Sequence, residues 1–309
     1  MSRVIVVGSA NTDLTVKTGH LPRSGETVVG DEFMISYGGK GANQALAALK
    51  AGAGVTLLAK IGTDEYGNLL YDHLIQSGLP SKGLLRHREE PAGLALIVVD
   101  KEGRNQIVIV SGSNGHFMVE DLHRFEPLLQ AGSLLLTQLE IPLSTVEHAL
   151  RLAKARGMTT ILDPAPVSPL PPSVYSLVDI LTPNETEASS LTERKVETPA
   201  EAEKAASIFL SLGCRTVIIT LGARGALLSR AEGVEFFPPF LTRSVDTVGA
   251  GDAFNGALAA ALASDKSLPE AIRFACAAGS LSTTKRGAQE SLPEKTEVEH
   301  LLREKGIQK

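Results

Sequence analysis

Short runs of valine, isoleucine and leucine alternate with longer alanine- and leucine-rich segments along this chain. The strand-like runs are at 3–8, 55–62, 133–140, 159–163, 179–183 and 216–222. The helix-like segments are at 40–51, 65–77, 143–156, 199–212, 251–263 and 268–284. Continuous apolar strands that alternate with helices form parallel sheets covered on both faces. The pattern therefore predicts an α/β fold of three layers around a mostly parallel sheet.

Two segments break this alternation. Residues 14–36 alternate polar and apolar positions, and residues 92–112 have the pattern of a hairpin. Neither contains a helix-like run, so together they predict a small accessory antiparallel sheet attached to the α/β body. We expect residues 1–309 to form one domain, because the proline-rich stretch 163–173 is too short to link two domains.

The composition argues against several classes of partner and compartment. The formal net charge is −5 and basic clusters do not exceed pairs such as Lys285–Arg286, so we expect no binding to nucleic acid or anionic membranes. We also expect neither a signal peptide nor a membrane span, because no apolar run approaches the ~20 residues that a spanning helix needs. Cys214 and Cys276 lack the spacing of a metal site, which predicts buried thiols in a reducing cytoplasm.

Ligands of open α/β sheets bind outside the carboxyl ends of the strands, so the residues after each strand are candidates for a site. Asn11 and Asp13 follow the first predicted strand. Their side chains suit hydrogen bonds to hydroxyl groups, or they stabilise a turn. Glu140 ends a later strand, where a charge also commonly marks the surface.

The stretch Gly38–Gln44 places three glycines where a helix is expected to begin. Backbone N–H groups at such a point can bind oxygen atoms, although an ordinary glycine-rich turn is the alternative. Lys40 is followed by Gly41 rather than by serine or threonine, so the stretch is not a Walker A loop. No GxGxxG follows the first strand, which disfavours a nicotinamide-dependent dehydrogenase.

Two later strand ends carry further candidates. Asn184 and Glu187 offer oxygen ligands to a hard divalent cation, or they form a helix N-cap with its third-position glutamate; the two interpretations are compatible. The turn Thr220–Gly225 places two glycines around a basic residue. That arrangement is typical of a nucleotide-contacting turn and also of a hairpin.

The stretch Asp246–Phe254 runs from small residues into a helix-like segment. Gly249, Ala250 and Gly251 offer backbone N–H groups at a helix N-terminus, whose partial positive charge favours an anion. Asp252 then falls in the first helical turn, where it either stabilises the helix or acts as a base. A base beside an anion site is what phosphoryl transfer to an alcohol requires.

The stretches Gly38–Gln44 and Asp246–Gly256 resemble the two signatures of the ribokinase-type (PfkB) sugar kinases. The resemblance covers nearly the whole chain in order, with 11–13 before the first signature and 182–187 and 220–222 between the two. It implies a ribokinase-like fold in which the accessory sheet is a lid. It also implies ATP-dependent phosphorylation of the 5-hydroxyl of D-ribose, giving ribose 5-phosphate and ADP.

The resemblance implies a role for each matching position. Asp252 would be the base, and the amides of Gly249, Ala250 and Gly251 would bind the transferring charge. The residues implied to hold the sugar are Asn11, Asp13, Gly39, Lys40, Gly41, Ala42, Asn43, Glu140 and Asp252. Those implied to contact the nucleotide are Asn184, Thr220, Leu221, Gly222, Ala223, Arg224, Gly225, Gly251 and Cys276.

Metals and a partner subunit are also implied by the resemblance. Asn184 and Glu187 would lie in the region of Mg²⁺. An activating monovalent cation, usually K⁺, would be held by groups of Asp246, Val248, Ser282, Lys285, Gly287 and Ser291. The lid sheet would form the interface of a homodimer.

Two positions depart from the family pattern, and several alternatives stay open. Cys276 stands where a histidine is often found near the adenine, and Asp163 stands where some relatives carry asparagine. Asp163 is either an extra carboxylate near the metal or a residue that merely ends a strand, and we favour the second. The alternative substrates are 2-deoxyribose and, less favoured, fructose or another sugar, and the alternative function is a non-catalytic sugar sensor.

Overall fold

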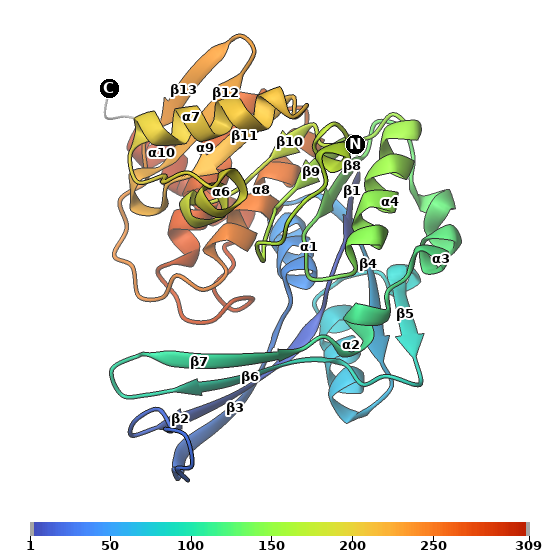
Figure 1. The fold of residues 1–309 in the computed structure, drawn as a ribbon, viewed down its shortest axis with the longest axis vertical. Helices are drawn as coiled ribbons and strands as arrows, with labels where there is room; N and C mark the ends of the chain where they lie inside the picture. The colour runs from blue at the N-terminus through green and yellow to red at the C-terminus, as the bar shows by residue number, and fades with distance from the viewer. Residues whose placement is uncertain (1–2, 307–309) are drawn as a thin grey trace.

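The computed structural model describes residues 3–306 and contains a nine-stranded sheet between two layers of helices (Figure 1). The strands, in spatial order, are β13 (Gly233–Phe237), β12 (Ala226–Arg230), β11 (Thr216–Thr220), β10 (Ile180–Leu181), β9 (Thr159–Leu162), β8 (Leu134–Thr137), β1 (Arg3–Val7), β4 (Gly54–Gly62) and β5 (Leu84–His87). All pairs from β5 to β11 are parallel, and β12 and β13 are antiparallel. The predicted three-layer α/β fold with a mostly parallel sheet is confirmed.

The strand sequences explain the two helical layers. Val4 and Val6 of β1 pack into one buried apolar cluster, whereas Ile5 and Val7 pack into the other, as the alternation of a strand dictates. The first cluster is covered by α1 (Lys40–Lys50), α2 (Glu65–Gln76), α8 (Ala250–Ala263), α9 (Leu268–Ser282) and α10 (Lys295–Gly306). The second is covered by α3 (Val119–Leu122), α4 (Leu143–Ala155), α5 (Pro172–Tyr175), α6 (Glu185–Thr192) and α7 (Pro199–Ser211). Short 3₁₀ turns occur at Ser81–Gly83, Gly112–His116, His123–Leu128 and Gly222–Arg224.

Helices α1 and α8 pack closely because their contact surface is made of small residues. A Cβ atom at Gly256 of α8 would lie 2.5 Å from the Cβ of Ala47 and 2.5 Å from the carbonyl oxygen of Gln44, both on α1. Only glycine allows this approach. The contact sets the first turn of α8 beside the first turn of α1.

The strand order reverses direction at β1. From β1 the chain builds β4 and β5 on one side and then returns to build β8, β9, β10 and β11 on the other. Loops at the carboxyl ends of β1 and β8 therefore diverge, and such a switch point is where open α/β sheets bind ligands.

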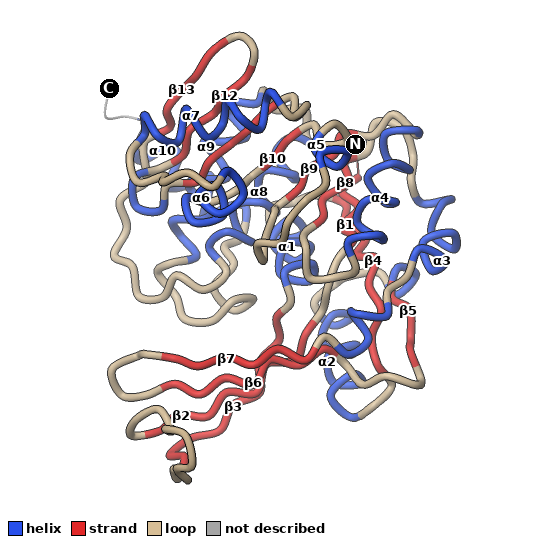
Figure 2. The backbone as a smooth tube through the Cα atoms, in the orientation of Figure 1, coloured by secondary structure: helices blue, strands red, loops and turns tan. Residues whose placement is uncertain are grey.

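A separate four-stranded sheet projects from the body (Figures 1 and 2). Its order is β3 (Gly30–Gly38), β2 (Asn11–Thr18), β6 (Gly93–Val99) and β7 (Asn105–Val110). Both hairpins of the predicted accessory sheet are antiparallel, and the central strands β2 and β6 pair in parallel. The reason is that both central strands leave the body from the same end. We call this unit the lid sheet.

Several elements were not predicted. The hairpin β12–β13 and the edge strand β5 are short, and helix α10 is largely polar, so their periodicity is weak. The turn at Gly222–Arg224 joins β11 to antiparallel β12, as the hairpin interpretation of that stretch requires. Within residues 3–306, none of the helices combines the length and the apolar character needed to cross a membrane.

Candidate active site

The carboxyl ends of β1 and β8 are joined through Glu140. Its Oε2 accepts hydrogen bonds from the Ser9 hydroxyl at 2.5 Å and from the backbone N–H of Lys40 at 2.8 Å. The second bond satisfies an N–H group at the start of α1. Glu140 thus ties both strand ends to the glycine-rich stretch, rather than marking an exposed surface.

Asn114 holds the start of β2. It is buried, and it bonds both backbone groups of Ala10, accepting at 3.0 Å and donating at 3.1 Å. Its amide also donates to Oδ1 of Asn11 at 2.7 Å. Because the oxygen of Asn11 is occupied, its amide nitrogen is the group left to donate to a ligand.

Asp13 lies at the root of the lid sheet and is partly buried. Burial raises the pKa of its carboxyl to about 7, and the negative charges of Glu140 and Glu290 act in the same direction. A carboxyl group in this state can serve as donor or acceptor toward a hydroxyl near neutral pH.

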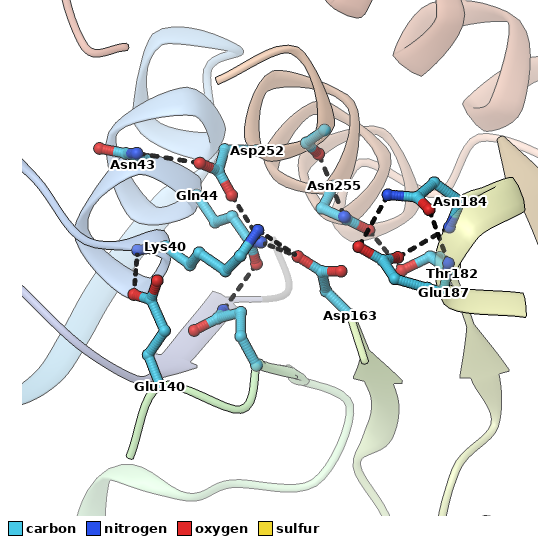
Figure 3. A network of polar contacts seen from close by, with 12 residues as sticks. Lys40, Asn43, Gln44, Glu140, Asp163, Thr182, Asn184, Glu187, Asp252 and Asn255 are labelled. Carbon is cyan, nitrogen blue, oxygen red and sulfur yellow. Dashed lines mark hydrogen bonds and ion pairs between the residues drawn. The ribbon is translucent and has the colours of Figure 1, made fainter. Parts of the chain in front are cut away.

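Asp252 is 5% exposed and is held between two amides of α1 (Figure 3). Its Oδ2 accepts from Asn43 Nδ2 at 2.9 Å, and its Oδ1 accepts from Gln44 Nε2 at 3.0 Å. The two donors fix the plane of the carboxylate at the first turn of α8. Asp252 therefore does more than stabilise its own helix.

Gln44 connects Asp252 to the end of β9. Its Nε2 also donates to Asp163 Oδ2 at 2.7 Å, and its Oε1 accepts from Gln138 Nε2 at 2.6 Å. Gln138 Oε1 is buried and has no partner among the described residues. The interpretation of Asp163 as merely a strand-end residue is wrong, because its carboxylate turns inward and joins this network.

One ammonium group faces several carboxylates. Lys40 Nζ lies 3.8 Å from Asp163 Oδ2 and reaches across the site in Figure 3. Burial alone would lower the pKa of Lys40, but the charges of Asp163, Asp252, Glu140 and Glu187 outweigh it and raise the pKa. The site therefore keeps a protonated lysine.

The pKa values of two neighbouring carboxyl groups are raised as well, which favours their neutral form. Burial raises the pKa of Asp163 to about 7 against the attraction of Lys40, with Glu187 and Asp252 adding to the rise. Burial also raises the pKa of Glu187, opposed by hydrogen bonds from Asn184 and by Lys40. Excess negative charge of this kind favours a bound cation.

The first turn of α8 opens on a cavity. Its N-cap is Gly249, which has φ 77°, a left-handed conformation that suits glycine. Within residues 3–306, no side chain caps this helix end. The N–H of Ala250 donates to the Thr247 carbonyl at 3.2 Å, whereas those of Gly249 and Gly251 have no partner among the described residues. These two groups and the partial positive charge of the helix are available to an anion.

The cavity holds about 430 Å³, the size of a small-molecule pocket. Apolar walls come from Phe240, Leu241 and Phe254. The predicted nucleotide residues that line it are Asn184, Thr220, Gly222, Ala223, Gly225, Gly251 and Cys276.

Two predicted nucleotide residues do not reach the cavity. Leu221 is buried in the second apolar cluster, because it follows β11 on the side away from the cavity. The Arg224 guanidinium instead bonds Glu185 and the carbonyl of Glu197. The structure therefore removes both side chains from the predicted contacts.

Asn184 and Glu187 form the predicted capping box of α6. Asn184 Oδ1 accepts from the Glu187 backbone at 2.9 Å, and Glu187 Oε2 accepts from the Asn184 backbone at 2.8 Å. Their side chains still lie at the edge of the cluster around Lys40 (Figure 3). Among the described residues, no three His, Cys, Asp or Glu side chains form a ready-made metal site.

Asp246 joins two loops behind the first turn of α8. Its carboxylate accepts from the backbone N–H of Val248 at 3.1 Å and of Gly287 at 3.0 Å. The hydroxyls of Ser282 and Ser291 are buried and donate to carbonyls three residues earlier. Lys285 directs its ammonium away, to Glu297 at 3.0 Å, so only its backbone remains near the predicted cation position.

The sequence of this chain matches a family of known proteins. Residues 1–295 match the sequence profile of the family described as "pfkB family carbohydrate kinase". The chain belongs to this family. This carbohydrate kinase has a sequence 42% identical to that of a ribokinase of Haemophilus influenzae, over 96% of this chain and 97% of that protein.

Two further similarities are relevant to this kinase. The structure of Arabidopsis thaliana ribokinase complexed with ribose and ATP superposes with a TM-score of 0.91 at 34% identity, covering 98% of this chain and 99% of that one. A deoxyribokinase of Salmonella typhimurium is 34% identical over 94% of this chain and 95% of that protein.

Several residues of the kinase site were not predicted individually. They are the buried amides Asn114, Gln138 and Gln289, together with Thr182 and Asn255, which bond each other at 2.7 Å between β10 and α8. Gln44 lies inside the quoted glycine-rich signature but was given no role. The only local signal for these residues was a polar side chain next to an apolar strand or helix.

Proposed function

We propose that this carbohydrate kinase transfers the γ-phosphoryl group of ATP to the 5-hydroxyl of D-ribose. The observation that carries the proposal is the position of Asp252. Its carboxylate is held by two amides of α1, and the two residues just before it, Ala250 and Gly251, line the cavity at the first turn of α8. The similarity to ribokinases supports ribose as the acceptor.

In the proposed step the Asp252 carboxylate takes the proton of the sugar hydroxyl. The hydroxyl oxygen then forms a bond to the γ-phosphorus while the bond from phosphorus to the β,γ-bridging oxygen breaks, and ADP leaves. The N–H groups of Gly249, Ala250 and Gly251 stabilise the charge on the transferring oxygens. The ammonium of Lys40 contributes positive charge from the opposite side.

We assign the sugar to the region formed by Ala10–Asp13, Gly39–Gln44 and Gln138–Glu140, and we call it the sugar side. Side-chain groups of Asn11, Asp13, Asn43 and Glu140 converge there. We call the cavity lined by Thr220, Gly222 and Gly225 the nucleotide side. Its apolar walls suit a planar base, and the glycines allow close approach of the ligand to the backbone.

The residues present fit two cations. Mg²⁺ typically uses one or two carboxylates together with substrate phosphates, and Glu187 and Asp163 lie where such a contact is expected. When bound, it would neutralise charge on the nucleotide. For K⁺, the Asp246 carboxylate and the carbonyl groups of Val248, Lys285 and Gly287 are the proposed ligands, with Ser282 and Ser291 supporting the loops.

The lid sheet supports a proposal on assembly. Strand β7 exposes apolar side chains on both of its faces, with Ile107 and Val108 at 52% and 61% exposure. A lid over the sugar accounts for one face, and a second copy of the chain accounts for the other. We infer a single domain that dimerises through the lid sheet.

Paired substitutions on β7 test this assignment. Ile107→Asp with Ile109→Asp alters one face, and Val108→Asp with Val110→Asp alters the other. One pair should yield a monomer in light scattering, and the other should raise the KM for ribose. A wild-type chain that is monomeric at micromolar concentration would contradict the dimer.

We place the reaction in the cytoplasm, consistent with two free and buried cysteines. Cell fractionation tests this location.

The substrate is tested with purified enzyme in a coupled assay for ADP. Ribose, 2-deoxyribose and fructose are compared by kcat/KM, with K⁺ or tetramethylammonium as the monovalent cation. The proposal predicts the highest kcat/KM with ribose and activation by K⁺. A preference for 2-deoxyribose would favour the second candidate, which the deoxyribokinase similarity supports. No ADP formation with any sugar would indicate a sensor.

A further inference from the structure

A chain of hydrogen bonds runs from helix α2 to the catalytic carboxylate. His73 Nε2 lies 2.8 Å from Gln289 Oε1, and Gln289 Nε2 donates to Asn43 Oδ1 at 3.0 Å. Asn43 Nδ2 then donates to Asp252 Oδ2 at 2.9 Å, as Figure 3 shows. The four residues come from α2, from the loop after α9, from α1 and from α8.

The chemistry of the groups gives this chain one direction. An ionised carboxylate only accepts, so Asn43 must present its nitrogen to Asp252 and its oxygen to Gln289. Gln289 must then present its nitrogen to Asn43 and its oxygen to His73. His73 must donate from Nε2, which defines its tautomer.

Burial makes the direction costly to reverse. Gln289, Asn43 and Asp252 are 5%, 6% and 5% exposed, so water has little access to replace a lost partner. A flip of either amide would set two acceptors or two donors against each other. His73 therefore satisfies the last acceptor, Oε1 of buried Gln289, in the orientation that the Asp252 carboxylate imposes on both amides.

His73 also contacts the lid sheet. Its ring stacks on that of Tyr37 with centroids 4.1 Å apart and an angle of 20° between planes. Tyr37 is near the end of β3, immediately before the glycine-rich stretch. Gln289 belongs to the same loop as Gly287, which is bonded to Asp246. The hydrogen-bonded residues thus contact the lid sheet, the proposed cation loop and the sugar side.

We propose that His73 is a positioning residue for phosphoryl transfer, acting through Gln289 to orient the Asn43 amide toward Asp252 and the sugar. The inference rests on the proposed function, since it takes Asp252 as the base. It assigns His73 no contact with substrate. It predicts that loss of the Nε2 donor impairs the sugar side and spares the nucleotide side.

The test compares His73→Phe, which keeps the ring stack and removes the donor, with His73→Gln, whose amide can replace the Nε2 donor. His73→Phe should lower kcat/KM for ribose about tenfold, as loss of supporting hydrogen bonds commonly does, with KM for ATP unchanged within about twofold. His73→Gln should recover most of the loss. His148→Phe, a ring on α4 outside the site, is the matched control and should keep wild-type kinetics.

A second variant keeps the test decisive if His73→Phe folds poorly. Gln289→Glu preserves shape but removes the donor to Asn43, and it should lower kcat/KM for ribose about 100-fold. Adding His73→Phe to Gln289→Glu should cause no further loss, because the chain is already broken.

Three results would overturn the proposal. They are wild-type kinetics in His73→Phe, equal losses in His73→Phe and His73→Gln, and additive losses in the double variant. If the wild-type chain does not phosphorylate ribose, the proposed substrate fails separately. The same variants are then assayed with the sugar that it does phosphorylate.

Discussion

On the sugar side of Asp252 the contacts are made by side chains, whereas on the nucleotide side they are made largely by backbone and small residues. The sugar side is a buried network in which Gln44 alone bonds Asp252, Asp163 and Gln138. The nucleotide side is a cavity lined by four glycines, Gly222, Gly225, Gly251 and Gly279, and by a helix end that no described side chain caps. Substitutions that remove a polar side chain should therefore impair the sugar side most. Substitutions that restrict or displace the backbone should impair the nucleotide side most.

The largest of the compared effects is expected for Gln44→Leu. It removes a donor from both Asp252 and Asp163 inside a buried site. We expect kcat to fall about 100-fold and the free energy of unfolding to fall by about 1–3 kcal/mol. Steady-state kinetics and urea unfolding measure both. Gln76→Leu, at an exposed position on α2, is the control, and equal effects in the two variants would break the comparison.

Gly225→Ala should produce the next effect, on the nucleotide side. Gly225 has φ 98°, and a Cβ atom there would lie 2.0 Å from the carbonyl oxygen of Phe237. The forced shift should cost about 1–3 kcal/mol of stability and raise the KM for ATP about tenfold. Gly222→Ala, with open space around its Cβ, should have a smaller effect. A larger effect of Gly222→Ala would contradict the backbone argument.

Asp13 allows a test through pH. Because its pKa is raised to about 7 in the folded chain, its favourable contribution is present at low pH and is lost as pH rises through about 7. Relative to Asp13→Asn, the wild-type free energy of unfolding should therefore decrease between pH 5 and pH 8. Urea unfolding at both values measures the difference, and the exposed Asp31→Asn is the control. An increase with pH in the stability of the wild type relative to Asp13→Asn would contradict the raised pKa of Asp13.

The smallest effect is expected for Cys276→Ala. Burial raises the pKa of this thiol to about 12, so it lines the cavity as a neutral, apolar group. Truncation of a single contact of this kind should change the KM for ATP by less than about fivefold. A loss of more than an order of magnitude would show that the nucleotide side also depends on individual side chains.

The sequence predicted the body of the fold because each strand carries its own signal. Val4–Val7 and Val217–Ile219 are apolar at every position, and the structure buries both faces of those strands. The parallel pairing of β2 with β6 had no local signal, because it depends on where two separate hairpins leave the body. The two signatures supplied Asn43 and Asp252, and local chemistry suggested a role for the second.

The rest of the site could not be read from local pattern. Asn43 and Asp252 are 209 residues apart, and Gln289 is 246 residues from Asn43. Neutral amides such as Asn114 and Gln138 are common in loops, and only their burial and partners distinguish them. Asp163 illustrates the same limit, since a carboxylate after a strand points outward or inward according to residues distant in the chain.

The most direct measurement combines turnover and ribose binding in Asp252→Asn, the residue on which both sides converge. A general base typically contributes about 10²–10⁴-fold, so kcat should fall by that range. Ribose affinity by calorimetry should stay within about threefold, because the sugar side is otherwise intact. Near-wild-type turnover in a folded Asp252→Asn protein would contradict the assignment of Asp252 as the base.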